Sequence, residues 1–459
     1  HQKAFAGQTF DRTVHKGDLT GIEIINRLAE QVWARGIHRL EEHRAVDLIP
    51  AVDGQSIAGV LLIDMRSGEF VLARAKAVVL ATGGGPTMYK YHTPSGEKSC
   101  DGLAMALRSG LALRDMEMVQ FHPTGLLAGS GTRMTGTVLE EGLRGAGGHL
   151  LNGEKQRFMG SYDPRLERAT RDIVSRSIFS EMRAGRVTPN GGVYISMAHL
   201  GPEHVRKSFK GMVDRCADCG FDLAGGLVEV VPTAHYMMGG VEFGVDCSTA
   251  LAGLFAAGED TGGVHGANRL GGNGVANSTV FGGIAGDTAA DWLARFGALG
   301  EFDRDALDRA IERWERPFRQ APGDLNSIRE RLYELMWNDV GILREHRALT
   351  RAVEGLQALH EELQRTGVSA ASRAYHLAWH DWMNLDSLLL ISKTITHAAL
   401  ARCDSRGAHF REDYPQPGNM EQSAFTRIRL QGDGYSTQFV PVEFSRVAPG
   451  KSLIEPEPA

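Results

Sequence analysis

The chain has 459 residues, a formal net charge of −6 and five cysteines. The charge is small for this length and no dense Lys/Arg block occurs, which argues against nucleic acid as the main partner. No apolar run approaches the length of a membrane span, and the first residues, HQKAFAGQTFDRT, lack a signal-peptide pattern and do not resemble the start of a fold. We therefore expect a fragment of a soluble, cytoplasmic protein with reduced thiols and about two to four domains.

The first part of the chain alternates helical and strand-like patterns. Apolar residues recur at helical spacing over residues 21–34, where Asp18 and Thr20 are candidate N-terminal caps. Strand-like runs and further helices follow, the strands at residues 59–63, 70–73 and 77–81 and the helices at residues 101–113 and 171–182. The last strand ends in Thr82-Gly83-Gly84, and a buried strand that meets a glycine loop is typical of ligand sites in α/β sheets.

The most distinctive stretch covers residues 252–286. A short apolar run predicts a buried strand that stops at Gly258-Glu259, before a glycine-rich loop and a helical pattern from about Ser278. Backbone N–H groups and the positive end of a helix dipole would then face the same space. The alternative is a tight turn between a core strand and a core helix. The loop also carries polar side chains, which favour a ligand site: His265, Asn268 and Arg269.

The composition changes at about residue 301, where glycine becomes rarer and charge increases. Helical periodicity predicts a helical domain with helices at residues 307–318, 328–336, 348–363 and 383–401. The remaining tail has a hairpin pattern at residues 426–442, around Gly432-Asp433-Gly434, and ends in the polar EPEPA.

Several polar residues outside the glycine loop are candidates for a site: His122, Thr124, Glu140, Glu141, Arg144, Arg176 and His235. Taken singly, each has an ordinary alternative as a core histidine or a surface ion-pair residue. Together, however, Arg, His and Thr are the groups that hold a small dicarboxylate through charge pairing and neutral hydrogen bonds. Cys216 and Cys219 form a lone CxxC, for which incidental thiols are a simpler explanation than a redox or zinc site.

Separate motifs along the chain carry a resemblance to a known family. FHPTG, the GLRGAGG that follows Glu140 and Glu141, HYMMGG and HGANRLGGN occur in the order seen in the flavoprotein subunits of succinate dehydrogenase and fumarate reductase. The sequence resembles L-aspartate oxidase more loosely. MWNDVGILREHRAL and SRGAHFREDYP are similar to the C-terminal region of the same family, so the resemblance covers about residues 6–414.

The resemblance implies an α/β FAD-binding domain interrupted by an α+β capping domain, then a helical domain and a small C-terminal domain. We expect the FAD-binding domain at residues 1–120 and 235–296, the capping domain at 121–234, the helical domain at 297–402 and the C-terminal domain at 403–459. The family's leading βαβ unit with its G-x-G-x-x-G, and the segment whose histidine is often joined to FAD, are absent from the sequence. The first part is therefore expected to be truncated and to hold one half of the cofactor site.

By the same resemblance, FAD is the cofactor. Glu259 would bond a hydroxyl group of FAD, and the helix after Asn273 would direct its positive end at the flavin ring. The resemblance places further cofactor contacts at Thr82, Gly83, Gly84, Asp101, Asn273, Gly274 and Val275.

The resemblance also implies the substrate and the reaction, the interconversion of succinate and fumarate in electron transport. The dicarboxylate would be held by His122, Thr124, His235 and Arg269. Arg176 would pass a proton to or from one carbon while the flavin exchanges a hydride with the neighbouring carbon, and Glu141 and Arg144 would relay that proton. Because guanidinium has a pKa above about 12, we expect Glu141 to hand over a proton as Arg176 gives up its own.

Some positions depart from the family pattern. Glu140 replaces a threonine, the segment 126–139 is longer, and Gly274-Val275-Ala276 stands where Ser-Leu-Leu is usual. The exact substrate, the reaction direction, the electron acceptor, the covalency of FAD and the oligomeric state therefore stay open. An iron–sulfur protein is the expected partner and would place the chain at the inner face of a membrane without inserting it. The alternatives are a soluble L-aspartate oxidase-like enzyme and a non-catalytic, flavin-free fragment.

Overall fold

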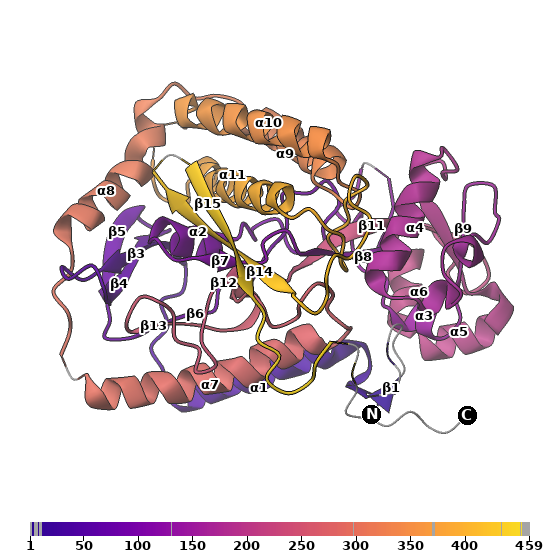
Figure 1. Cartoon of the computed structure of the whole chain (residues 1–459), viewed down its shortest axis with the longest axis horizontal. Helices are drawn as coiled ribbons and strands as arrows, with labels where there is room; N and C mark the ends of the chain where they lie inside the picture. Colours follow the sequence, from indigo (N-terminus) through magenta and orange to yellow (C-terminus); the bar gives the residue numbers. More distant parts are fainter. Residues whose placement is uncertain are drawn as a thin grey trace.

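The computed structural model describes residues 2–3, 8, 12–129, 131–296, 298–369, 372–432, 434–449 and 451. Figure 1 shows a large body and a smaller lobe beside it. One hydrophobic cluster unites the sheets of the body with its long helices, and a separate cluster fills the smaller lobe. The smaller lobe thus has a core of its own.

The body contains two sheets built from the first part of the chain. Strands β3 (His43–Pro50), β4 (Ile57–Asp64) and β5 (Glu69–Arg74) form an antiparallel sheet in that order. Strand β6 (Val78–Leu80) pairs in parallel with the distant β13 (Leu254–Ala256), so two glycine loops follow neighbouring strand ends. The predicted strands are confirmed, whereas β3 escaped prediction because charged residues interrupt its apolar pattern.

Helix α2 (Asp101–Arg108) packs against β3 and is shorter than predicted, because Gly110 follows in the left-handed region with a φ of 80°. Helix α7 (Asn273–Arg295) begins before the predicted start near Ser278. Its first turn contains Gly274, a weak helix former that hides the start of the pattern.

Helix α1 (Thr20–Ala34) confirms the predicted helix but not its cap. Leu19 is the N-cap residue and makes no side-chain cap bond, whereas Thr20 lies inside the helix and accepts a hydrogen bond from the Lys16 N–H. The side chain of Asp18 lies outside the described part. No residue of α1 is buried, and Ile22, Ile25, Leu28 and Trp33 are each at least 59 % exposed. Figure 1 shows α1 and α7 along the lower edge of the molecule.

The smaller lobe is built on an antiparallel sheet with the order β8-β11-β10-β9. Its strands are β8 (Val119–Leu126), β9 (His149–Leu151), β10 (Val193–Ser196) and β11 (Val228–Met237). Its helices are α3 (Gly142–Gly145), α4 (Arg171–Arg183), α5 (Pro202–Ser208) and α6 (Lys210–Ala217). The long pair β8 and β11 joins the lobe to the body and carries FHPTG and the start of HYMMGG.

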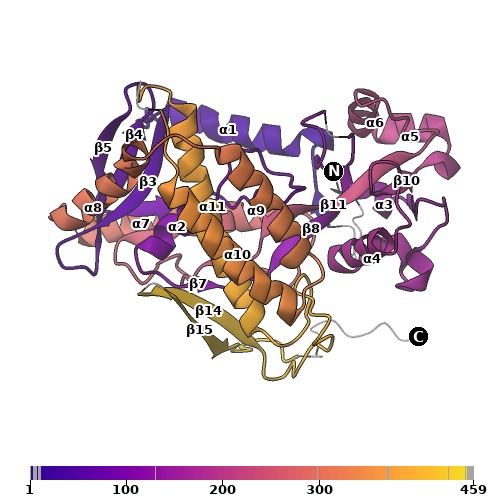
Figure 2. The same cartoon turned by 90° about the horizontal axis from the view of Figure 1, so that it is seen from above.

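The predicted helices of the second half of the chain are confirmed. They are α8 (Arg304–Glu315), α9 (Leu325–Asp339), α10 (His346–Arg365) and α11 (Leu377–Ala401). Asp303 and Asp324 cap the first two by accepting hydrogen bonds from the backbone N–H groups of Ala306 and Ser327, both at 3.0 Å. Figure 2 shows α9, α10 and α11 lying across the body from above.

The predicted C-terminal hairpin is also confirmed, as β14 (Ala424–Gln431) and β15 (Gly434–Pro441). It joins β7 (Leu113–Arg114) and β12 (Gly240–Val241) in the sheet order β12-β7-β14-β15. The turn residue Asp433 and the EPEPA tail lie outside the described residues. Two short strands, β1 (Gln2–Lys3) and β2 (Thr13–Val14), pair near the start of the chain.

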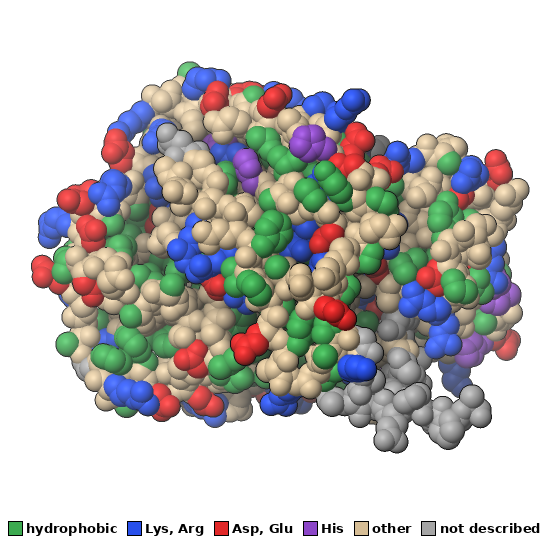
Figure 3. Space-filling model, viewed as in Figure 1, with side chains coloured by type: hydrophobic (Ala, Val, Ile, Leu, Met, Phe, Trp, Pro, Cys, Tyr) green, Lys and Arg blue, Asp and Glu red, His purple; other side chains and the backbone are tan. Residues whose placement is uncertain are grey.

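Short 3₁₀ helices complete the elements, at Gly17–Leu19, Met159–Ser161, Leu166–Arg168, Ala198–Leu200, Gly258–Asp260 and Arg316–Arg319. Acidic and basic side chains are interspersed over the face of the molecule shown in Figure 3. Within the described ranges, no helix is both long enough and apolar enough to cross a membrane.

Candidate active site

A network of buried, charged side chains links helix α3 to the start of α4. Glu141 precedes α3 and Arg144 lies three residues later, a spacing that lets side chains on one helix face meet. Arg144 Nη2 donates to Glu141 Oε1 at 2.9 Å, and Arg171 Nη2 donates to Glu141 Oε2 at 2.7 Å. These side chains are at most 7 % exposed. Glu141 therefore bridges two guanidinium groups inside the protein.

The buried side chains around Glu141 carry an excess of positive charge. Burial alone would raise the pKa of Glu141, but Arg171 and Arg144 together outweigh burial and lower it, so the carboxylate is ionised. Burial lowers the pKa of the nearby Arg269 to about 10, and repulsion from Arg171 adds to the shift. Glu259 also lies within range of Arg269, but burial raises its pKa to about 7. Two buried guanidinium groups thus contact the ionised carboxylate of Glu141, and a third, that of Arg269, lies within electrostatic range of it.

Two histidines line the same region from neighbouring strands. His122 on β8 and His235 on β11 have ring centroids 5.5 Å apart. The Thr124 backbone N–H donates to His122 Nδ1 at 3.3 Å, so Nε2 carries the proton of the neutral ring. His235 Nδ1 lies 2.8 Å from Thr93 Oγ1. Burial, with the charge of Arg171, lowers the pKa of both rings well below its usual value, so both act as neutral hydrogen-bonding groups.

Thr124 does not take the predicted place among the substrate ligands. Its side chain is fully buried, and its Oγ1 donates to the carbonyl oxygen of Leu139 at 2.9 Å. The hydroxyl proton therefore holds β8 against the segment that leads to Glu141. Because a hydroxyl group has one proton to donate, none is left for a carboxylate.

Arg269 lies beside the first turn of α7 and against an aromatic ring. Its guanidinium carbon is 4.2 Å from the centre of the Tyr236 ring. Nη1 makes a long hydrogen bond of 3.5 Å to the Leu270 carbonyl, and Nε is buried without a partner among the described residues. A Cβ added at Gly274 would lie 3.1 Å from Nη1 and 2.9 Å from Tyr236 Cε2. An arginine held against a ring with unused donors is suited to bind a carboxylate.

The Thr82-Gly83-Gly84 loop after β6 is tied to the residues that follow β13. Thr82 Oγ1 and the Gly83 backbone N–H donate to the Asp260 carboxylate at 2.8 Å and 3.0 Å. Burial raises the pKa of Asp260 to about 6. A Cβ at Gly84 would clash with the side chain of Glu259, so glycine permits this close approach. The two predicted loops therefore meet at one edge of the parallel pair.

These residues fit part of a flavin-nucleotide site. Glu259 Oε1 accepts a hydrogen bond from the Met237 N–H at 2.9 Å, and its pKa of about 7 suits a carboxyl group that bonds hydroxyl groups. Gly272 precedes α7 with a φ of 83° and makes no side-chain cap bond; the Asn273 N–H donates to the Leu270 carbonyl at 3.2 Å, which leaves the N–H groups of Gly274 and Val275 for a ligand. Asn273 and Val275 of this turn line a cavity of about 1040 Å³, together with Glu140 and the segment around Thr13.

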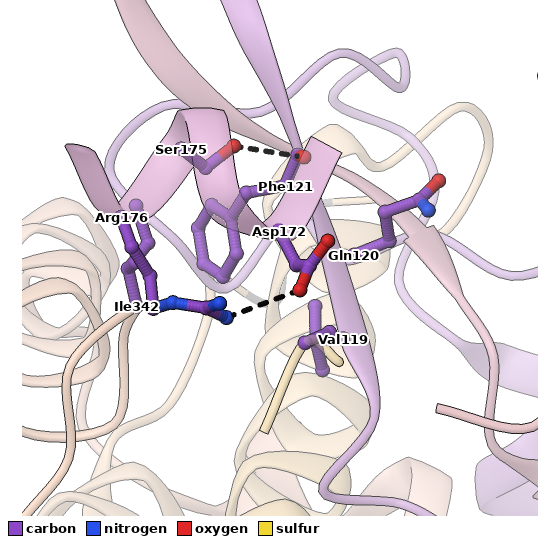
Figure 4. Close-up of a pocket in the computed structure, with 8 residues that line it drawn as sticks. Val119, Gln120, Phe121, Asp172, Ser175, Arg176 and Ile342 are labelled. Carbon is purple, nitrogen blue, oxygen red and sulfur yellow. Dashed lines mark hydrogen bonds and ion pairs between the residues drawn. The ribbon is translucent and has the colours of Figure 1, made fainter. Parts of the chain in front are cut away.

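Arg176 lies apart from the Glu141 network that it was predicted to join, and Asp101 forms an ion pair. Arg176 Nη1 donates to the Gly407 carbonyl at 2.8 Å and pairs with Asp172 at 3.3 Å, as Figure 4 shows for Asp172. It occupies a different side of α4 from Arg171. The Asp101 carboxylate pairs with Arg44 at 3.2 Å, while the next residue, Gly102, packs against the side chain of Thr82.

Several residues in these networks are not among the candidates that the sequence predicts: Thr93, Gln120, Arg171, Tyr236 and Asp260. Arg171 starts the predicted helix 171–182, and Asp260 directly follows the candidate Glu259. Both lie next to predicted features, but neither belongs to a distinctive motif. Gln120 directly precedes FHPTG, and Tyr236 follows the histidine of HYMMGG, so the strands that carry these motifs were the signal that could have found them.

The cysteines do not point to a metal centre. The thiol of Cys216 is buried, and burial raises its pKa to about 12, while Cys219 is half-buried and free. Over the ranges that the structure describes, no group of three or more His, Cys, Asp and Glu side chains is arranged to hold a metal ion.

Comparisons with known proteins agree with these observations. Residues 1–275 match the family model described as an FAD binding domain, and residues 329–455 match the fumarate reductase flavoprotein C-terminal model. The chain is 39 % identical over 415 residues to a component of the CoM/CoB fumarate reductase of Methanothermobacter marburgensis, a match that covers 90 % of this chain and 75 % of that protein. It is 33 % identical over 441 residues to the succinate dehydrogenase flavoprotein subunit of Coxiella burnetii, covering 91 % and 74 %.

A solved structure extends the match to the fold. An Escherichia coli quinol fumarate reductase FrdA variant superposes with a TM-score of 0.90 at 31 % identity and covers 98 % of this chain and 80 % of that chain. The chain therefore belongs to the family of FAD-dependent flavoprotein subunits of fumarate reductase and succinate dehydrogenase.

Proposed function

We propose that this chain interconverts a saturated and an unsaturated small dicarboxylate, of the succinate and fumarate type, with FAD as its redox cofactor. The observation that carries the proposal is the excess of buried positive charge: Arg144, Arg171 and Arg269 lie around the ionised Glu141. Buried charges are costly unless they are paired. A substrate with two carboxylates would supply the missing negative charges.

The chain's own residues would hold the two carboxylates at opposite ends. Arg269 has an Nε without a partner in the described part of the chain and is held against Tyr236, so it would bind one carboxylate. His122 and His235 are neutral and lie side by side, so they would donate hydrogen bonds to the other carboxylate without adding charge. This arrangement would place the carbon–carbon bond between Arg269 and the histidines, next to Arg171.

Arg171, rather than Arg176, would move the proton. It is buried and hydrogen-bonded to Glu141, which in turn accepts from Arg144. A guanidinium group releases a proton only if another replaces it at once. The ionised Glu141 would take a proton from Arg144, which solvent reprotonates, and hand one to Arg171 as Arg171 protonates the substrate carbon; the reverse reaction would run the relay backwards, so that no neutral arginine accumulates.

FAD, when bound, supplies the acceptor or donor of the hydride. Glu259, the Gly83 loop held by Asp260, and the N-terminus of α7 would hold and orient it. The positive end of α7 would favour negative charge on the reduced ring. Thr82, Gly84, Asn273, Gly274 and Val275 stay in this proposed site, whereas Asp101 would act through Arg44 and not by contact.

The finer assembly is also a proposal. We expect the domain boundaries given from the sequence, with residues 121–234 as the capping domain, and an iron–sulfur protein as the electron partner at a membrane surface. The motivation is that the relatives are flavoprotein subunits and that one matched structure is a quinol fumarate reductase. Co-purification of a red-brown iron–sulfur protein with the tagged chain from its native host would test this partnership.

The test of the reaction uses the flavin-loaded protein without oxygen. Succinate should bleach the visible flavin absorbance, and fumarate should restore it. L-Aspartate is the informative comparison, because its ammonium group would add a positive charge to an already positive site. Bleaching by aspartate but not by succinate would instead support the oxidase-like alternative, and a flavin-loaded protein that neither compound bleaches would contradict both enzymatic functions.

A further inference from the structure

A hydrogen-bonded bridge connects Arg171, which would protonate the substrate carbon, with Arg269, which would bind one substrate carboxylate. Gln120 is almost fully buried; its Oε1 accepts from Arg171 Nη1 at 3.0 Å, and its Nε2 donates to the carbonyl of Arg269 at 2.6 Å. The same Nε2 lies 3.3 Å from Asn268 Oδ1, and Asn268 Nδ2 donates to Asp172 Oδ1 at 2.8 Å. Because Asp172 follows Arg171 and Asn268 precedes Arg269, the contacts form a closed circuit.

The outer end of this circuit is braced by the C-terminal part of the chain. Asp172 pairs with Arg176, whose Nη1 donates to the Gly407 carbonyl and whose guanidinium group lies 4.9 Å from the Phe410 ring centre. Figure 4 shows the guanidinium group of Arg176 directed at Asp172, with the Gln120 amide pointing away on the other side. The residue next to Gly407 donates its backbone N–H to the Ala267 carbonyl at 2.8 Å. The glycine loop is thus held at Asn268 from both sides.

We propose that the contact between Asn268 and Asp172, here called the Asn268–Asp172 bridge, sets the span between Arg269 and the smaller lobe that carries Arg171, His122 and His235, and thereby selects the length of the dicarboxylate. The inference rests on the proposed function of those two arginines. Arg171 belongs to α4 of the smaller lobe and Arg269 to the glycine loop of the body. Both guanidinium groups carry positive charge and repel each other, so their spacing depends on the residues that join them. Asn268 and Asp172 are positioning residues in this proposal.

The amide at position 268 is required by the chemistry of both neighbours. Its oxygen accepts from Gln120 Nε2 while its nitrogen donates to the Asp172 carboxylate. A carboxylate at this position would keep the first contact and turn the second into repulsion between like charges. Leucine or alanine at position 268 would lose both contacts. The expected consequence is a wider and less defined span, with the catalytic groups themselves unchanged.

The experiment compares Asn268→Asp with the matched control Asn152→Asp. Asn152 makes the same pair of contacts inside the smaller lobe: its Oδ1 accepts from backbone N–H groups, and its Nδ2 donates to Glu181 at 3.1 Å. Binding of fumarate and of the five-carbon glutaconate is measured by titration calorimetry, and kcat and KM are measured on the flavin-loaded protein. Asn268→Asp should weaken fumarate binding about tenfold and raise KM more than it lowers kcat.

The selectivity for length decides the proposal. We expect the preference for fumarate over glutaconate to fall about tenfold in Asn268→Asp and to stay at the wild-type value in Asn152→Asp. The double variant, which combines Asn268→Asp with Asp172→Asn, restores a donor–acceptor pair and should recover most of the preference for fumarate. An unchanged preference for fumarate in Asn268→Asp, or a loss of preference that the double variant does not recover, would contradict the proposed role of the Asn268–Asp172 bridge. If the wild-type chain binds neither dicarboxylate, the proposed function itself fails, which is a separate outcome.

Discussion

Arg171 donates two hydrogen bonds to one oxygen of Glu141, from Nη2 at 2.7 Å and from Nε at 3.2 Å. Arg144 occupies the other oxygen at 2.9 Å. The carboxylate is therefore shared by two buried guanidinium groups, and its ionisation depends on both. This relationship distinguishes Arg171 from Arg176 of the same helix and motivates the first prediction.

Replacement of Arg171 should abolish turnover. Arg171→Lys keeps a positive charge but loses the planar fork that donates to Glu141 from two nitrogens and to Gln120 from the third. Because a positioned proton donor contributes about 10²- to 10⁴-fold to rate, we expect kcat to fall by that order while flavin stays bound. The matched control is Arg176→Lys, whose side chain contacts Asp172 and Gly407 outside the charged cluster. If the rate of fumarate reduction falls equally in both variants, the proton donor is either Arg176 or neither arginine.

A dicarboxylate should stabilise the protein, because it adds negative charge where buried positive charge is in excess. At a concentration about 100 times its Kd, fumarate should add about 2.7 kcal/mol to the free energy of unfolding. Crotonate, which has one carboxylate, should add much less at the same concentration. Urea unfolding with each ligand measures the difference. Equal stabilisation by both compounds would contradict the two-ended site.

A side chain at Gly274 should disturb Arg269. The added Cβ of Gly274→Ser would lie 2.9 Å from Tyr236 Cε2 and 3.1 Å from Arg269 Nη1, so the ring and the guanidinium group must shift. We expect KM for the dicarboxylate to rise about tenfold, with a smaller change in kcat, since carboxylate binding is lost in both the ground state and the transition state. Gly283→Ser on the same helix is the control, because nothing among the described residues lies within 4 Å of its added Cβ. A normal KM in Gly274→Ser would separate Arg269 from substrate binding.

Asp115 should make stability depend on pH. Burial raises the pKa of Asp115 to about 7, and the neighbouring Glu117 adds to the shift, whereas its pKa in the unfolded chain is about 3.9. The native state therefore binds the proton more tightly. The stability that this group contributes is complete below about pH 4 and is lost as pH rises towards about 7.

The isosteric variant Asp115→Asn tests this expectation, because its side-chain oxygen can still accept the hydrogen bond from the Thr426 N–H. Urea unfolding across the same pH range should show the wild type losing stability relative to the variant as pH rises. Parallel pH profiles for the two proteins would show that Asp115 does not titrate in this window.

The long helices and the strands β4, β5, β6, β13, β14 and β15 could be predicted from the sequence, whereas the four strands of the smaller lobe were not predicted. Helical periodicity is a local property, and it located α1, α4 and the long helices of the second half within a few residues. Strand β3 escaped because Arg44 and Asp47 interrupt its apolar pattern. Their partners, Asp101 and Trp314, come from distant parts of the chain. Long-range pairing of this kind leaves no local signal.

The sequence by itself determined which motifs carry the site: FHPTG, EEGLRG, HYMMGG and the glycine loop each hold residues that the structure places near Glu141 or Glu259. Only the tertiary structure decided which arginine of α4 contacts Glu141. Arg171 and Arg176 are five residues apart, so they point about 140° apart around a helix axis. The packing of α4 against β8 turns Arg171 towards Glu141 and leaves Arg176 to Asp172 and Gly407. That choice depends on contacts between segments that are distant in the sequence.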